Sequence, residues 1–269
     1  MFDSDVEALE HIEREAWRDF AAAAPAAFAA RVGLATHELG RALLLTASRV
    51  PLFQFNWLSG AGLDGADADA IPAAVARFRD AGQRKFFVQI PPTPHAGRLE
   101  AQARAEGLAP HPMAWTKFER ETRDPPHVET ALSIHEVGGG ERDLFAATVV
   151  AGYGMAPPMA AWLREIVGRP GWSCYVGFAD DEPAGAGALF VDEDAAWLGI
   201  GATKPAFRKR GGQSALIARR LGDAARRGAR FAVTETGVSQ PGEPAPSHRN
   251  ILAAGFRAAY ARPNWAFAA

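Results

Sequence analysis

The spacing of hydrophobic residues predicts a chain in which helices alternate with strands. Apolar residues recur every three or four positions in several segments, as is typical of helices with one buried face. These segments are 5–24, 71–81, 96–106, 141–150, 159–167 and the stretch from Ser214 to a stop at Gly228. Hydrophobic or alternating runs predict strands at 43–58 (with a turn near 49–51), 86–90, 114–118, 132–137, 172–178, 184–191, 195–200, 231–234 and 260–267.

The order of elements in the second half indicates a meander followed by a crossover. Acidic turn residues at 180–183 and 192–194 separate three consecutive strands, which predicts antiparallel hairpins. The last of these strands leads through a glycine-containing loop into the helix at 214, and a strand at 231–234 follows. We therefore expect a strand–loop–helix–strand unit whose loop lies at the end of the sheet.

Composition limits the classes of protein to consider. The chain has 269 residues, 48% hydrophobic and 22% charged, which is enough for one large or two modest globular domains. The net charge of −2 argues against a global attraction to nucleic acid or anionic membranes. The single cysteine, Cys174, excludes an internal disulfide and fits a reducing cytoplasm, and its alternation with Trp172 and Val176 predicts a core position.

No metal-ligand spacing is present among the histidines, so we expect no metal site. The acidic start of the chain lacks a signal-peptide pattern, and the apolar run at 42–45 is too short to span a membrane. We therefore expect a cytoplasmic protein that binds neither membranes nor nucleic acid. A nucleic-acid-binding role for the arginines between Arg208 and Arg230 is the weakest alternative.

The loop before the helix at 214 carries the most distinctive chemistry. It runs Arg-Lys-Arg-Gly-Gly-Gln from Arg208 to Gln213. Adjacent glycines let the backbone approach a ligand, and the start of a helix presents free N–H groups and a positive dipole end to an anion. The pattern predicts a pyrophosphate site, with a solvated basic turn as the alternative.

Two common phosphate motifs do not fit this loop. A P-loop requires a lysine and a hydroxyl residue directly after its last glycine, whereas Gln213 and Ser214 follow here. The dinucleotide fingerprint requires three spaced glycines, and Gly199-Ile200-Gly201 lacks the third.

The loop and its flanks instead resemble the Gcn5-related N-acetyltransferase (GNAT) family, whose motif is Arg/Gln-x-x-Gly-x-Gly/Ala. Arg208 and Gly211 occupy its first and fourth places, while Gln213 stands where Gly or Ala is usual. Thr203-Lys204-Pro205, the Gly255-Phe256 pair and the strand at 260–267 match the family's flanking features. The resemblance covers about 132–267. It implies an α/β (α+β) fold, with a mixed, mostly antiparallel sheet flanked by helices.

Both halves of the chain repeat one order of elements, which indicates an internal duplication. Helix, Gly82, strand, helix, Gly107-Leu108 and an aromatic strand in the first half correspond to helix, Gly228, strand, helix, Gly255-Phe256 and an aromatic strand in the second. Two prolines at 125–126 mark the linker. We expect a degenerate GNAT-like domain at 1–126, without the cation run, and an acetyl-coenzyme A-binding domain at 127–269.

The resemblance implies an acetyl-coenzyme A-dependent N-acetyltransferase acting on a primary amine. A non-catalytic acyl-coenzyme A sensor or interaction module is the alternative, because Ile251 stands where the family often has the tyrosine that acts as general acid. The residues expected to bind the cosubstrate are Gly201, Ala202, Thr203, Arg208, Lys209, Arg210, Gly211, Gly212, Gln213, Ser214 and Asn250. The chain could be a monomer, if one chain mimics a family dimer, or a homodimer.

Candidates for proton transfer and for the acceptor site complete the prediction. Glu235 is the first candidate base, with a structural pairing to nearby arginines as the alternative, and His248 is the second. Tyr260 is the first substitute for the missing acid, and Tyr153 is another. We expect Tyr153, Met155 and Trp162 to line the acceptor site, with helix–sheet packing as the alternative.

Overall fold

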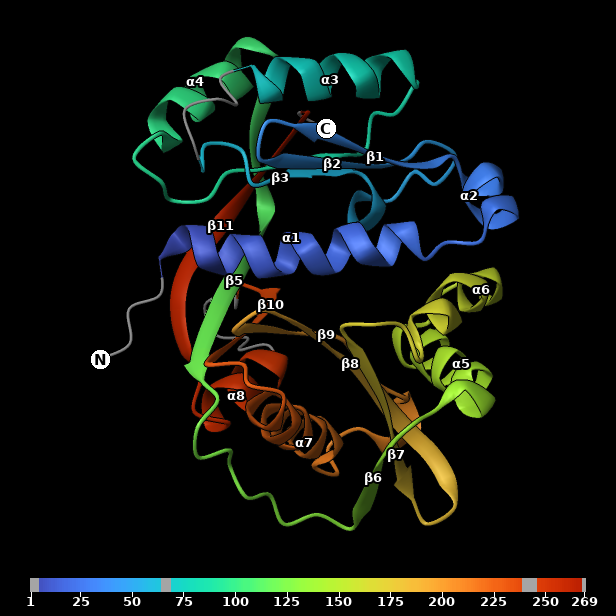
Figure 1. The fold of residues 1–269 in the computed structure, drawn as a ribbon. Helices are drawn as coiled ribbons and strands as arrows, with labels where there is room; N and C mark the ends of the chain where they lie inside the picture. Colours follow the sequence, from blue (N-terminus) through green and yellow to red (C-terminus); the bar gives the residue numbers. More distant parts are fainter. Residues whose placement is uncertain (1–4, 64–68, 239–245, 268–269) are drawn as a thin grey trace.

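The computed structural model describes residues 5–63, 69–238 and 246–267 (Figure 1). Within these residues the strands form one mixed sheet of eleven, in the order β1-β2-β3-β4-β11-β5-β10-β9-β8-β7-β6. The strands are β1 (Leu34–Leu39), β2 (Ala42–Ala47), β3 (Trp57–Ser59), β4 (Phe87–Gln89), β5 (Leu108–Glu121), β6 (Leu132–Glu136), β7 (Trp172–Ala179), β8 (Glu182–Asp192), β9 (Ala195–Thr203), β10 (Phe231–Gly237) and β11 (Arg257–Phe267). Only β3/β4 and β9/β10 pair in parallel, so the predicted mixed, mostly antiparallel sheet is confirmed.

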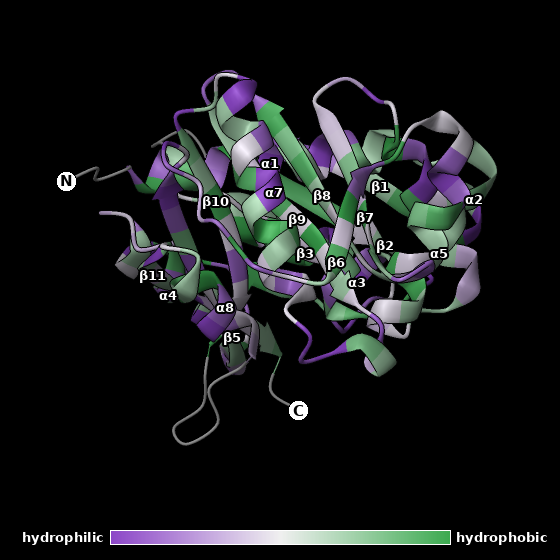
Figure 2. Ribbon diagram, turned by 90° about the horizontal axis from the view of Figure 1, so that it is seen from below, coloured by the Kyte–Doolittle hydropathy of each residue, from purple (hydrophilic) through white to green (hydrophobic). Residues whose placement is uncertain are grey.

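Helices cover both faces of this sheet, and in Figure 2 long helices such as α1 and α7 carry both hydrophobic and hydrophilic residues. They are α1 (Val6–Ala22), α2 (Ala26–Val32), α3 (Ala70–Asp80), α4 (Ala96–Ala105), α5 (Arg142–Tyr153), α6 (Ala160–Leu163), α7 (Gly212–Arg226) and α8 (Pro246–Ala253). One core cluster joins α1, α2, α5 and α6 to one face of both halves of the sheet. On the other face, α3 and α4 cover the first half and α7 and α8 the second, in two separate clusters.

Alternation along the strands explains why both faces are covered. In β9, Trp197 belongs to the α1–α5 core, whereas its neighbours Ala196 and Leu198 belong to the α7–α8 core. In β2, Leu43 and Leu45 face one core and Leu44 the other, and all three are fully buried. Successive side chains of a strand point to opposite faces, so an uninterrupted hydrophobic run requires two covering layers.

Each half repeats one topology, and the halves exchange their last strands. The order β2–β3–α3–β4–α4–β5 in the first half matches β8–β9–α7–β10–α8–β11 in the second, each with an antiparallel and then a parallel pair. However, β11 lies between β4 and β5, and β5 lies between β11 and β10. The two long strands cross from one half to the other (Figure 1). The division at 126/127 remains a prediction, and 122–131 contains neither helix nor strand.

Some elements differ from the sequence prediction. The edge strand β1 and the short helix α2 were not predicted; β1 exposes polar positions such as Thr36 and Glu38, which obscures its pattern. The expected helix at 159–167 consists of α6 flanked by 3₁₀ turns at Pro157–Met159 and Arg164–Ile166. Strand β5 runs from Leu108 rather than from 114. In the described part, no helix is long and apolar enough to cross a membrane.

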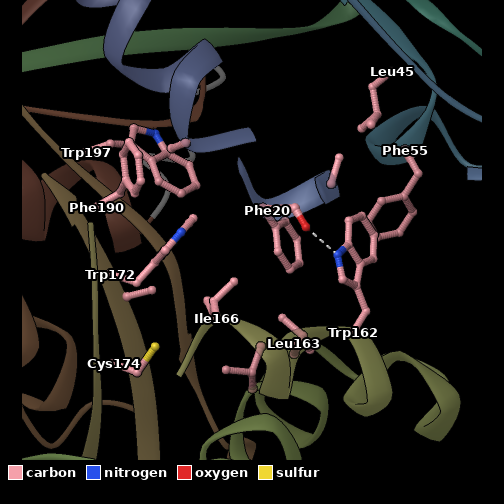
Figure 3. Packing of buried hydrophobic residues seen from close by; sticks show 14 of the residues in the cluster. Phe20, Leu45, Phe55, Trp162, Leu163, Ile166, Trp172, Cys174, Phe190 and Trp197 are labelled. Atoms are coloured by element: carbon pink, nitrogen blue, oxygen red, sulfur yellow. Dashed lines mark hydrogen bonds between the residues drawn. The ribbon is translucent and has the colours of Figure 1, made fainter. Parts of the chain in front are cut away.

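The core between the halves is centred on Phe20 of α1. Its ring stacks on Trp162 at 4.0 Å between centroids, and Trp162 Nε1 donates to the Phe20 carbonyl at 2.7 Å (Figure 3). Trp172 approaches Phe20 from the meander at 6.3 Å, and Cys174 is buried in the same core. Trp162 is 1% exposed and thus belongs to the packing of α6 against α1.

Candidate active site

Strands β9 and β10 run side by side only at their start. Their register covers Phe231↔Ala195 to Val233↔Trp197, and beyond that point the strands separate. Thr234 spans the beginning of the gap, because its Oγ1 donates to the Leu198 carbonyl at 2.8 Å. Backbone groups on this side of β9 are therefore left without a neighbouring strand, and a ligand can use them.

A β-bulge lies at the widening gap. The β8/β9 register shifts between Ala186↔Ala202 and Ala188↔Gly199, so β9 holds one more residue than β8 there. Ile200 adopts φ 51°, a left-handed conformation that a β-branched residue rarely takes. Such strain costs on the order of 1–3 kcal/mol and is concentrated at functional sites. The predicted cosubstrate residues Gly201, Ala202 and Thr203 follow directly.

The basic loop forms a tight turn at the start of α7. Lys209 and Gly211 both have positive φ, 64° and 78°, and Gly211 is the N-cap. The first intrahelical bond runs from the Ala215 N–H to the Gly211 carbonyl at 3.0 Å, so the amides before Ala215 are available to an anion. The first turn of α7 carries no acidic residue. The structure thus brings the predicted residues 208–214 together at a helix N-terminus.

Two cations of the loop have partners of their own. Arg208 donates to the Thr203 and Gly152 carbonyls at 3.4 and 3.3 Å, which ties the loop to the ends of β9 and α5. Arg210 lies over the Phe207 ring at 5.4 Å. Asn250 of α8 donates to Gln213 Oε1 at 2.7 Å, so Gln213, the residue that departs from the family motif, links α7 to α8.

A cavity of about 430 Å³ runs through the gap between β9 and β10. It is lined from the α7–α8 face by Gln213, Ile217, Arg220, Ser247 and Ile251. From the opposite face and from the first half it is lined by Glu13, Trp17, Phe20, Phe53, Gln54, Phe55, Trp57, Phe87, Gln89, Trp115, Tyr153, Met155, Met159 and Leu163. The strands contribute Trp197, Leu198, Gly199, Ile200, Gly201, Thr234, Glu235 and Thr236. The cavity therefore connects the two faces of the sheet at the bulge.

A buried ion cluster forms one end of this cavity. It contains Glu10 and Glu13 of α1, Lys117 of β5, Glu235 of β10 and Arg262 of β11. Arg262 donates to Glu10 and Glu235 at 2.7 Å each and to Glu13 at 3.2 Å. Lys117 contacts Glu13 and lies 3.3 Å from Glu235. Both cations are on the exchanged strands, so the cluster exists only because the halves interlock.

The cluster shifts the pKa values of its members. Burial raises the pKa of Glu10, but Arg262, Lys117 and the Tyr260 hydroxyl outweigh that effect and lower it to about 2. Burial, followed by repulsion from Arg262, lowers the pKa of Lys117. Burial and then the Glu10 carboxylate raise the pKa of Tyr260.

The two predicted catalytic residues, Glu235 and Tyr260, differ in their position relative to the cavity. Glu235 lines the cavity, and its recorded contacts, to Arg262 and Lys117, are made through Oε2 in the described part of the chain. Tyr260 donates to Glu10 Oε1 at 2.7 Å and is not among the described residues that line the cavity. Its position therefore favours the packed-aromatic alternative over a proton donor. His248 packs edge-on against Phe118 at 4.9 Å and is also not among the lining residues.

Two of the three residues predicted to line the acceptor site border the cavity. Tyr153 and Met155 line the cavity, whereas Trp162 does not. Burial raises the pKa of Tyr153 to about 12 although the residue is 50% exposed. Both observations fit a side chain that borders a cavity, where surface is accessible but surrounded by protein. At neutral pH the hydroxyl therefore carries its proton.

Sequence patterns did not reveal Arg220, which lies beneath the bulge. It is 3% exposed, and its Nη1 donates to the Ala188 and Gly199 carbonyls and its Nε to the Leu216 carbonyl, all at 3.0 Å. Burial lowers its pKa to about 10, so it is a cation at neutral pH. Among the described residues no carboxylate is paired with it. Nothing in the sequence of an arginine-rich amphipathic helix distinguishes this arginine from its neighbours. In the structure it packs closely on Gly187, where an added Cβ would lie 3.0 Å from its guanidinium carbon.

Comparisons with solved structures relate this architecture to known proteins. A GCN5-related N-acetyltransferase from Kribbella flavida superposes with a TM-score of 0.64 at 12% identity, over 97% of this chain and 96% of that one. Another from Sphaerobacter thermophilus gives 0.59 at 16%, over 98% and 92%. A protein described as a tandem GNAT from the clavulanic acid biosynthesis pathway gives 0.59 at 17%, over 98% and 95%.

The chain has the fold of the GCN5-related N-acetyltransferases. The structure described as a tandem GNAT covers 98% of this chain, which agrees with the tandem arrangement inferred from the sequence. No protein-family model and no curated protein matches the sequence. At 12–17% identity the likeness concerns the GNAT fold, and the chemistry depends on the residues of this chain.

Proposed function

We propose that this protein is an acetyl-coenzyme A-dependent N-acetyltransferase that acts on a primary amine. The observation that carries the proposal is the cavity through the β9/β10 gap, with a basic helix N-terminus at the head of α7. Acetyl-coenzyme A places its pyrophosphate on the amides from Arg210 to Ser214. Its pantetheine arm follows the unpaired side of β9 from Gly201 to Thr203, and Asn250 borders the arm.

The thioester then lies at the bulge. The backbone amides near Ile200 and Gly201 stabilise the negative oxygen of the tetrahedral intermediate, and Arg220 adds a positive charge beneath them. Losing one such donor typically slows acyl transfer by about 100-fold or more. The left-handed backbone of Ile200 supports this placement, because it sets the orientation of the peptide groups in the bulge.

Protons have to leave the acceptor and reach the thiolate. An amine is protonated at neutral pH and must lose a proton before it attacks. The amine nitrogen bonds to the acetyl carbon, the C–S bond breaks, and one further proton leaves the nitrogen. Glu235 accepts the ammonium proton through Oε1, the atom not engaged with Arg262, and passes it to water. The second nitrogen proton leaves after the C–N bond forms and replaces, through water, the proton that Tyr153 gives up. Tyr153, which borders the cavity with its hydroxyl protonated, donates to the coenzyme A thiolate.

A thiol-release assay with acetyl-coenzyme A and a panel of amines tests this function. Amine-dependent release of coenzyme A, with the acetylated amine detected by mass spectrometry, is the expected result. Calorimetric binding of acetyl-coenzyme A without release above hydrolysis for every amine would instead support the sensor. The observation that favours the sensor is that apolar Ile251 borders the cavity where the family often has its tyrosine. Failure to bind acetyl-coenzyme A contradicts both functions.

A further inference from the structure

The acceptor side of the cavity is walled mainly by aromatic rings. They are Trp17, Phe20, Phe53, Phe55, Trp57, Phe87, Trp115, Tyr153 and Trp197. Trp17 lies 5.6 Å from Trp57 and 6.1 Å from Trp197, with the rings tilted or edge-on. Trp17, Phe53, Trp115 and Tyr153 keep part of their surface exposed, so they have not used all of it for packing. Flat apolar groups gain most from such a wall, at about 25 cal/mol per Å² removed from water.

A negative charge lies at the end of this wall. The cluster has three carboxylates (Glu10, Glu13, Glu235) and two cations (Lys117, Arg262), which leaves one negative charge among its described members. The neighbouring Arg14 interacts with Glu15, at 4.0 Å, and with Glu10, and neither Arg14 nor Glu10 is among the described residues that line the cavity. The two members of the cluster that line the cavity, Glu13 and Glu235, are both carboxylates. A single cation in the cavity would balance the charge and would also be attracted by the ring faces.

We propose that the acceptor is a monoamine carried on an aromatic or similarly flat apolar body, with its ammonium directed to Glu13 and Glu235. This inference rests on the proposed acetyl transfer and specifies its acceptor. A second ammonium would find no further negative charge to balance it, so polyamines fit poorly. A carboxylate beside the amine would be repelled by the same two glutamates. The only cation lining the cavity in the described part, Arg220, lies on the α7 side at the bulge.

Three matched probes test the acceptor without altering the protein. Tyramine, tyrosine and 2-(4-hydroxyphenyl)ethanol share one ring and differ in the carboxylate or in the charge of the amine. Isothermal calorimetry should show tyramine binding at least about tenfold more tightly than either of the other two, which corresponds to one favourable charge contact of about 1.4 kcal/mol. Equal binding of the neutral alcohol, or tighter binding of tyrosine, overturns the proposal.

Transfer assays separate this inference from the function on which it rests. With acetyl-coenzyme A, tyramine should have a higher kcat/KM than cadaverine, spermidine or an amino sugar. If spermidine or the amino sugar is acetylated best, the acceptor class is wrong while the acetyltransferase stands. If tyramine binds with the expected preference but no amine is acetylated, the acceptor site stands and the acetyltransferase fails.

Two variants test whether the ammonium of the acceptor contacts Glu13. Glu13→Gln should weaken tyramine binding by about tenfold and leave the affinity for the neutral alcohol unchanged. Glu119→Gln is the control, because Glu119 is a buried, ion-paired carboxylate on β5 that does not line the cavity. Equal losses in the two variants would contradict a direct contact with Glu13. If Glu13→Gln does not fold, the three probes on the unaltered protein still decide.

Discussion

Lys117 and Glu235 lie directly opposite each other on β5 and β10, with the ammonium 3.3 Å from the carboxylate. One belongs to the first half of the chain and the other to the second. Because Arg262 of β11 also reaches Glu235, the exchanged strands supply both cations that hold this cavity-lining carboxylate in place. The first half therefore contributes charge and shape to the cavity, whereas the loop proposed to bind the pyrophosphate belongs to the second half.

Removing Lys117 should destabilise the interlocked sheet. Lys117→Met leaves the buried Glu13 and the half-buried Glu235 with Arg262 as their one cationic partner in the described cluster. Breaking a buried pair, here Lys117–Glu13, typically costs about 3–5 kcal/mol. Urea denaturation measures the loss. Arg123→Met is the control, since Arg123 is 78% exposed in its pair with Glu121 and its removal should cost less than about 1 kcal/mol. Similar losses for the two variants would refute the idea that the cluster holds the halves together.

Acid should weaken the same cluster over a defined range. The pKa of Glu10 falls from 4.5 to about 2 on folding, so the folded state binds fewer protons there than the unfolded state. Its stabilising contribution is complete above pH 4.5 and is lost as the pH falls toward 2, by on the order of 3 kcal/mol. Unfolding free energies between pH 6 and 2 for the wild type and Glu10→Gln should converge toward acid. Parallel curves for the two proteins would contradict the shift.

The pyrophosphate loop can be tested with a pair of glycines at opposite ends of α7. Gly211 and Gly228 both have positive φ and are exposed, so glutamate imposes similar backbone strain at either position. Only Gly211→Glu places a negative charge beside the free amides of the helix start. We expect its affinity for acetyl-coenzyme A to fall roughly tenfold or more, while Gly228→Glu binds like the wild type. Equal affinities of the two variants in calorimetry would remove the loop from the binding site.

The sequence predicted the parts of this molecule that are local in the chain. Residues 208–214 are contiguous, and the structure places their glycines and cations at the start of α7, where the sequence predicted a helix to begin. The repeated order of elements was likewise visible. The exchange of β5 and β11 was not, because Lys117 and Tyr260, 143 positions apart in the sequence, become neighbours through long-range pairing alone.

Glu13 shows why part of the site escaped prediction. On an isolated amphipathic helix a charged residue is expected in water, but Ile12, Glu13 and Arg14 of α1 are all buried. Three successive buried positions span more than half of the helix circumference, so α1 is enclosed by both halves of the molecule. Trp162 is the converse case. Its ring lies in a segment expected to flank the substrate, but it stacks on Phe20 and does not border the cavity.

The close packing of α5 against β9 should determine where Tyr153, at the end of α5, lies in the cavity wall. Gly152 lies against the strand so closely that a Cβ there would be 2.7 Å from the Ala202 Cβ and 3.1 Å from the Thr203 nitrogen. Gly152→Val must therefore push α5 away from β9, at a cost of about 1–3 kcal/mol. Tyr153, the next residue, should move with the helix end, and acetyl transfer should slow more than binding of acetyl-coenzyme A weakens.

The neighbouring residue provides the control for this change. Ala151 is exposed on α5, so Ala151→Val alters helix propensity by less than about 1 kcal/mol and leaves the contact with β9 intact. Thermal denaturation of both variants, together with kcat and the Kd of acetyl-coenzyme A, separates the two effects. If Gly152→Val is as stable and as active as Ala151→Val, the close approach of α5 to β9 does not position Tyr153. A loss of kcat with an unchanged Kd supports the proposed role of Tyr153 at the reacting thioester.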